Sequence, residues 1–75
     1  MSRHVTINLK ELVASRNISL RELARLSDIE PSIINKLANN KHERISLRHI
    51  ERIADALEVD DIRNIISIQT DKNKI

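Results

Sequence analysis

The sequence predicts one small, mainly helical domain of five helices, with a short antiparallel strand pair joining its N- and C-terminal segments. Two observations favour this fold class. Four segments begin with a residue suited to a helix N-terminus, and isoleucine precedes each of them. Two short strand signals flank the helices: residues 3–7 alternate apolar and polar side chains, and residues 65–69 are rich in β-branched residues. The 75 residues limit the chain to one domain, and the absence of Cys excludes disulfides.

The four helix starts share one spacing. The expected capping residues (N-caps) are Asn8, Ser19, Glu30 and Ser46. An isoleucine precedes each of them, and an aliphatic residue stands four positions after it, the spacing of a hydrophobic staple. The four pairs are Ile7 with Leu12, Ile18 with Leu23, Ile29 with Ile34, and Ile45 with Ile50. Because all four pairs are in phase with the caps, coincidence is a poor explanation.

These starts give the order of the elements. We expect a strand over residues 3–7, helices over 9–16, 20–27, 31–38 and 47–57, a short helix from Asp60, and a strand over 65–69. The core must be aliphatic because aromatic residues are absent. Its expected members are Leu9, Leu12, Val13, Leu23, Ala24, Leu26, Ile34, Leu37, Leu47, Ile50, Ile53, Ala54 and Leu57. Residues 71–75 are expected to form a flexible polar tail, so the domain comprises residues 1–70.

Polar residues are expected to start and end these helices. Asn8 and Ser19 each have a Glu three positions later, the pattern of a capping box. Glu30 precedes a proline at the first helical position, where a missing N–H costs nothing. The chain has no Gly, so Asn17 and the pair Asn39–Asn40 are expected to supply the left-handed conformations that end helices.

Composition excludes several classes of function. No apolar run reaches the length of a membrane span and no signal-peptide pattern is present, so we expect a cytoplasmic protein. The histidines lack metal-ligand spacing and no serine has a His and Asp pattern, so no enzyme activity, metal or cofactor is expected. Residues 1–48 hold 9 Lys and Arg against 5 Asp and Glu, whereas residues 49–75 hold 4 against 6. A polyanion would approach the basic half, although chance is a competing explanation in so small a domain.

The segment Ser19–Leu37 predicts two short helices joined by a tight turn, with a polar outward face on the second. The candidate base-reading residues on that face are Pro31, Ser32, Ile33, Asn35 and Lys36. Lys36 can donate to guanine, Asn35 can pair with an adenine edge, and Ser32 can donate or accept. Ile33 has two interpretations, contact with a thymine methyl group or partial burial.

Two further sets of residues complete the candidate surfaces. The expected phosphate contacts are Arg21, Asn39, Lys41 and Arg44. Arg21 can equally be a solvated helix charge. The expected dimer surface comprises Ile62, Ile65, Ile66 and Ile68. The competing role for these aliphatic residues is packing in the strand pair.

The chain after residue 18 has the order SLRELARLSDIEPSIINKLANNK, and residues 44–59 have the order RISLRHIERIADALEV. This order resembles the Cro/cI-type (Xre) helix-turn-helix family of phage and bacterial transcription regulators over about residues 7–66. The most telling residues are Ala24, Ile34, Leu37, Asn39 and the IADAL run. The resemblance implies a five-helix phage-repressor-like domain in a bacterial or phage-infected cell, whose third helix enters the major groove and which binds a near-palindromic operator as a homodimer.

The resemblance places the base-reading positions of the family on Pro31, Ser32 and Lys36. The chain departs from the family pattern at Leu20, where Gln is frequent, at Asp28 in place of the turn Gly, and at Glu30 in place of a Ser or Thr cap. Glu30 has two possible effects, acceptance of a hydrogen bond from cytosine N4 or weaker DNA binding.

Two functions therefore compete. The first is a sequence-specific, double-stranded DNA-binding transcriptional regulator, most simply a repressor. The second is a protein-interaction module on the same fold, such as an antitoxin partner or a phage-switch adaptor, with weak or no DNA binding. The modest net charge of +2 and Glu30 favour the second.

Overall fold

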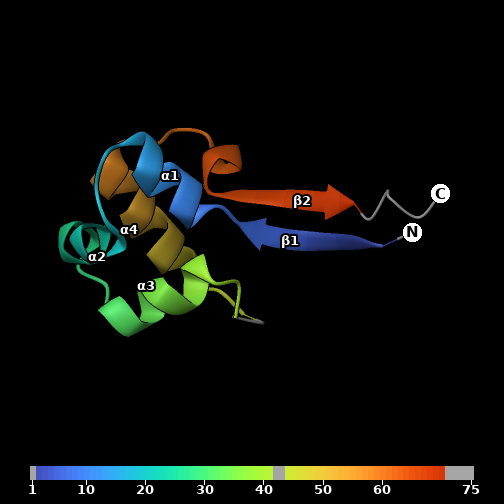
Figure 1. The fold of residues 1–75 in the computed structure, drawn as a ribbon, viewed down its shortest axis with the longest axis horizontal. Coiled ribbons are helices and arrows are strands. Elements are labelled where there is room, and N and C mark those ends of the chain that lie inside the picture. Colours follow the sequence, from blue (N-terminus) through green and yellow to red (C-terminus); the bar gives the residue numbers. More distant parts are fainter. Residues whose placement is uncertain (1, 42–43, 71–75) are drawn as a thin grey trace.

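The computed structural model describes residues 2–41 and 44–70. Its elements are β1 (Arg3–Ile7), α1 (Leu9–Ser15), α2 (Leu20–Ser27), α3 (Pro31–Ala38), α4 (Leu47–Leu57), the 3-10 helix η1 (Ile62–Asn64) and β2 (Ile66–Thr70). The helices pack together, and the two strands form a ribbon that projects from them (Figure 1). The predicted tail over residues 71–75 and loop residues 42–43 lie outside the described residues.

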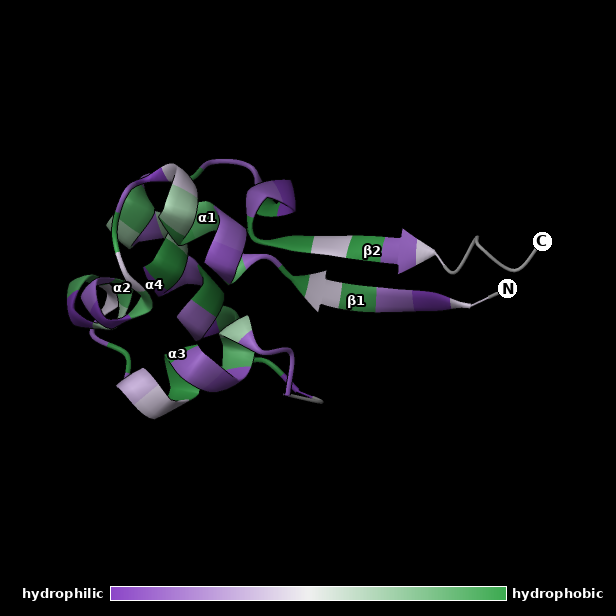
Figure 2. Cartoon of the chain, viewed as in Figure 1, coloured by the Kyte–Doolittle hydropathy of each residue, from purple (hydrophilic) through white to green (hydrophobic). Residues whose placement is uncertain are grey.

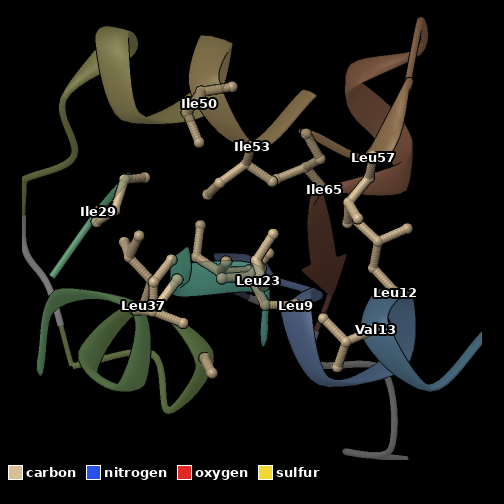
Figure 3. Packing of buried hydrophobic residues seen from close by; sticks show 14 of the residues in the cluster. Leu9, Leu12, Val13, Leu23, Ile29, Leu37, Ile50, Ile53, Leu57 and Ile65 are labelled. Atoms are coloured by element: carbon tan, nitrogen blue, oxygen red, sulfur yellow. The ribbon is translucent and has the colours of Figure 1, made fainter. Parts of the chain in front are cut away.

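Aliphatic side chains from all four α-helices form one core (Figure 3). Its largest fully buried members are Leu9, Leu23, Ile34, Leu37, Ile53 and Ile65. Full burial of such a side chain is worth about 1.5–3 kcal/mol, so these contacts dominate the stability of a chain without disulfides. Every residue of the four predicted staple pairs either belongs to this core or packs against it.

Two residues predicted to be buried are exposed instead. Leu26 is 44% exposed because it lies two positions after Ala24, about 200° around the helix from that buried residue. Leu47 is 74% exposed although it shares a helix face with Ala54. Leu47 is the first residue of α4, and helical side chains lean toward the N-terminus, so this one leans past the end of the helix.

The strand pair is present and antiparallel. Ile7 lies opposite Ile66 at the base of the ribbon, and Arg3 lies opposite Thr70 at its tip. Near the base of the ribbon, green apolar residues alternate with pale polar residues along both strands, and the tip is polar (Figure 2). β2 begins one residue later than expected, because Ile65 turns into the core and is 1% exposed.

The predicted fifth helix is not confirmed as an α-helix. In its place the described residues contain one 3-10 turn, η1, so they hold four α-helices. The Asp61 carboxylate accepts a hydrogen bond from the Arg63 backbone N–H at 2.9 Å and caps this turn. The chain then enters β2 at Ile66 and pairs with β1 instead of continuing as a helix.

The predicted capping box at Asn8 does not form, although Asn8 does take the N-cap position of α1. Its backbone N–H donates to the Ile65 carbonyl at 2.7 Å, and its side-chain amide donates to Ser67 Oγ at 3.2 Å. The Asn8 side chain therefore bonds to the ribbon and does not cap the N–H groups of α1. At Ser19 the predicted cap is confirmed, since its Oγ accepts from the Glu22 N–H at 3.0 Å.

Asparagine ends helices where Gly is absent, as predicted, at two of three positions. Asn17 and Asn40 have φ angles of 59° and 57°. Asn39 has φ −94°, so the left-handed residue after α3 is Asn40 alone. Glu58 also adopts φ 54°, which the sequence did not indicate.

Candidate nucleic-acid interface

The turn between α2 and α3 is short and well bonded. Asp28 adopts the left-handed conformation at φ 57°, and the Ile29 N–H donates to the Ala24 carbonyl at 3.1 Å. Ala24 is 3% exposed, and its small side chain lets the two helices approach closely. The buried Ser27 Oγ donates to the Leu23 carbonyl at 2.7 Å, which satisfies its hydroxyl inside α2. These contacts fix the angle at which α3 leaves the turn.

α4 also holds this turn from outside. Arg52 Nη1 donates to the Asp28 carbonyl at 3.3 Å. The two residues are 24 positions apart, so no local pattern in the sequence signals the contact. The left-handed residue of the turn is thus tied to a second helix.

The N-terminus of α3 begins as the sequence predicts, with Glu30 at the N-cap and Pro31 at the first position. The Ile33 and Ile34 N–H groups donate to the Glu30 carbonyl at 3.0 and 3.1 Å. The Glu30 side chain makes no capping hydrogen bond and is exposed. A carboxylate therefore stands at the leading end of the candidate recognition helix.

Four of the five candidate base-reading residues are exposed on α3, namely Pro31, Ser32, Asn35 and Lys36. Ile33 is half-buried and lies beside a shallow hollow of about 360 Å³, which Leu37 and His49 also line. The partial-burial interpretation of Ile33 is therefore the one that the packing favours. The polar face of α3 is left with a hydroxyl, a carboxamide and an ammonium group, which suit base edges.

Three of the four candidate phosphate contacts, Asn39, Lys41 and Arg44, follow α3 in the chain. Asn39 and Lys41 follow the last turn of α3 and are exposed, with their backbone N–H groups donating to the Asn35 and Lys36 carbonyls at 3.0 Å each. Arg44 is exposed and borders the hollow beside Ile33. Asn39 and Lys41 therefore lie at the C-terminal end of α3, and Arg44 lies beside its half-buried residue Ile33.

On α2, Arg21 is exposed in the first turn. Arg25, which stands one turn later, instead pairs with Glu22, with Arg25 Nε donating to Glu22 Oε1 at 3.2 Å and a second, closer contact through Nη2. This hydrogen bonding by Arg25 lowers the pKa of Glu22. Arg21 is thus the better placed of the two arginines to meet a phosphate.

The sequence interpretation missed a contact at the end of α3. The Ile7 N–H donates to Asn40 Oδ1 at 2.7 Å, and Asn40 Nδ2 donates to the Ile7 carbonyl at 3.4 Å. These residues are 33 positions apart, so only the folded chain brings them together. The end of the candidate recognition helix is joined to β1 through this carboxamide.

Only part of the candidate dimer surface is at the surface. Ile62 and Ile68 are 57% and 66% exposed and Ile66 is half-buried, whereas Ile65 is buried in the core. The exposed members border an apolar hollow of about 440 Å³ between η1 and β2. Ile65 therefore cannot contribute to such a surface in this fold.

Comparison with known proteins adds the family. A family model described as a Cro/C1-type HTH DNA-binding domain matches residues 8–71. The searches of curated proteins and of solved structures gave no significant match. Among residues 2–41 and 44–70, no helix has the length and apolar character needed to cross a membrane. From its helix-turn-helix geometry and from this match over most of its length, the chain belongs to the Cro/C1-type helix-turn-helix DNA-binding domains.

Proposed function

We propose that the protein is a sequence-specific, double-stranded DNA-binding repressor that reads the major groove with α3. The observation that carries this proposal is the exposed polar face of Ser32, Asn35 and Lys36 on α3. The orientation of α3 relative to α2 is fixed by the hydrogen bonds of the turn between them. An α-helix fits the major groove, and these side chains match the donors and acceptors of base edges. Asn39, Lys41 and Arg44 would hold phosphates and set the register. A domain bound at an operator blocks transcription by occupancy alone, so repression needs no further group.

Selection of bound DNA from a random library tests this function. We expect one preferred motif, and Lys36→Ala should weaken binding to it by about 1–3 kcal/mol while relaxing a single base position. Lys10→Ala is the control, because Lys10 is an exposed lysine on α1 outside the candidate interface. An equal loss on every DNA sequence would assign Lys36 to a phosphate, and recovery of no motif would refute the proposed function.

We also propose that the protein binds a near-palindromic operator as a homodimer through Ile62, Ile66 and Ile68. One recognition helix gives a small interface, and a two-fold dimer doubles it. Ile68→Lys should shift the monomer–dimer equilibrium toward monomer, measured by sedimentation equilibrium. Leu47→Lys is the matched control, since Leu47 is an exposed aliphatic residue on α4 away from these residues. A wild-type protein that sediments as a monomer, free and on DNA, would contradict the dimer.

A protein-interaction module is the second candidate function, and exposed Glu30 favours it. The Glu30 carboxylate stands next to the candidate base-reading residues, where it would repel DNA phosphates. The salt dependence of binding separates the two functions. DNA binding weakens steeply as the salt concentration rises, because the counterions displaced from the DNA are then released less favourably. Glu30→Gln should tighten DNA binding if α3 enters the groove, and should leave it unchanged if the partner is a protein.

A further inference from the structure

The carboxamide of Asn40 takes the place that a neighbouring strand would occupy beside Ile7. The Asn8 N–H donates to Ile65, so by the alternation of an antiparallel ladder the N–H and C=O of Ile7 point away from β2. Asn40 meets both groups, accepting from the N–H at 2.7 Å and donating to the C=O at 3.4 Å. Ile7 is 9% exposed, so its peptide groups have little access to water and depend on this side chain.

The same residue fixes the backbone around the candidate phosphate contacts. Asn40 has φ 57°, and its own N–H donates to the Leu37 carbonyl at 3.1 Å. Asn39 and Lys41 stand on either side of it and are exposed. Any rotation of the Asn40 backbone would move both neighbours, because Asn40 shares one peptide plane with Asn39 and the other with Lys41.

The left-handed backbone alone does not call for asparagine, because glycine adopts this conformation at no steric cost. The carboxamide is therefore a separate feature, and its two hydrogen bonds join the end of α3 to Ile7 of β1. The Asn40 side chain is directed at Ile7, so its oxygen and its amide nitrogen both bond within the protein.

We propose that Asn40 is a positioning residue for DNA binding, which rests on the proposed function. Its side chain anchors the end of α3 to β1 and thereby holds Asn39 and Lys41 where they meet successive phosphates. Asn40 acts through these neighbours and does not itself contact DNA. The β-ribbon is then a support for the DNA-binding surface as well as a closure of the domain.

Asn40→Gly tests the proposal, because glycine adopts the left-handed backbone without strain and lacks the side chain that bonds to Ile7. We expect the slope of log K against log salt to become shallower by about 1 for each phosphate that the variant no longer holds, with lower affinity at low salt. The base preference recovered by selection should stay unchanged, since the α3 face is intact. A merely structural role would lower the melting temperature and leave the slope, measured on the folded fraction, as in wild type.

Asn17→Gly is the matched control. Asn17 is also an exposed asparagine at positive φ, 59°, and its side chain makes no hydrogen bond among those of the described residues. This variant should bind DNA with the wild-type slope. If Asn40→Gly matches Asn17→Gly in slope and affinity, the positioning role is refuted while the proposed function stands.

A second measurement covers the case in which Asn40→Gly does not fold. In the wild-type protein, DNA that holds Asn39 and Lys41 should slow hydrogen exchange of the Ile7 amide, because it also holds the acceptor of that amide. An unchanged exchange rate in the DNA complex would overturn the proposal. Wild-type protein that recovers no DNA motif at all would remove the proposed function, and the role of Asn40 with it.

Discussion

Single residues end the helices of this protein without the help of glycine. Asn17, Asp28, Asn40 and Glu58 have φ angles between 54° and 59°. Asparagine and aspartate are the non-glycine residues that tolerate this conformation best, because a short polar side chain can bond locally. Glu58 has a longer side chain, and its conformation is held by hydrogen bonds of the α4 end, including the Val59 N–H to the Ala54 carbonyl at 2.9 Å.

Capping at Ser19 gives a prediction at this scale. Ser19→Ala removes the acceptor of the Glu22 N–H and should lower the free energy of unfolding by about 1 kcal/mol, measured by urea denaturation. Ser46→Ala is the control, because Ser46 occupies the N-cap of α4 without a capping hydrogen bond. Equal losses in the two variants would show that the cap on α2 contributes nothing of its own.

Individual site residues were predictable only where the sequence places them on one helix. The exposure of Ser32, Asn35 and Lys36 follows from the helical period and the buried stripe of Ile34 and Leu37. The bonds of Asn40 and Arg52 were not predictable, because their partners lie 33 and 24 positions away. A polar side chain looks the same in the sequence whether water or a distant carbonyl satisfies it.

At the scale of elements, α4 illustrates that the helical period alone does not decide whether a residue on the inner face is buried. Leu47 and Leu57 begin and end the same helix, yet they are 74% and 6% exposed. The period of the helix assigns both to the inner side, but Leu57 belongs to the buried core (Figure 3), whereas Leu47 lies outside it.

This contrast predicts unequal effects of one substitution. Leu57→Ala should lower the free energy of unfolding by about 2–5 kcal/mol, because it removes buried methyl groups and leaves a cavity. Leu47→Ala should change it by less than about 0.5 kcal/mol, as for most exposed positions. Chemical denaturation of both variants measures the difference, and a large loss at Leu47 would show that its surroundings are more closely packed than the structure indicates.

The replacement of a fifth helix by η1 and β2 also belongs to this scale. Acidic residues at 60–61 are a good helix start, and Asp61 does cap a turn. The residues that follow, from Ile66, pair with β1. The Ile65 carbonyl accepts a hydrogen bond from the Asn8 N–H, so it is not available for a bond within an α-helix. Pairing with a strand at the other end of the chain therefore outweighs the local preference.

At the scale of the whole molecule, two exposed ion pairs make stability depend on pH. Hydrogen bonds from the Arg63 side chain and backbone lower the pKa of Asp61 from 3.8 to about 2, and Arg25 lowers that of Glu22. A carboxyl group with a depressed pKa in the folded state stabilises the fold above its unfolded pKa and loses this effect as the pH falls. The free energy of unfolding should therefore decrease between about pH 4 and pH 2.

Asp61→Asn should flatten this decrease, measured as the urea midpoint at pH 5 and at pH 2.5. Asp60→Asn is the matched control, because the Asp60 side chain makes no hydrogen bond among those of the described residues. The same pH dependence in wild type and Asp61→Asn would mean that the pair with Arg63 does not persist in solution.

The sequence by itself determined where the four α-helices begin, most of the aliphatic residues that enter the core, and which face of α3 is polar, because these features depend on residues within one or two turns of each other. Only the tertiary structure decided that Asn8 serves the ribbon, that Ile65 is core, that η1 replaces a helix, and that Asn40 joins α3 to β1. Each of these depends on a partner far along the chain. A buried peptide N–H or C=O group is stabilised only when the fold brings its hydrogen-bond partner next to it.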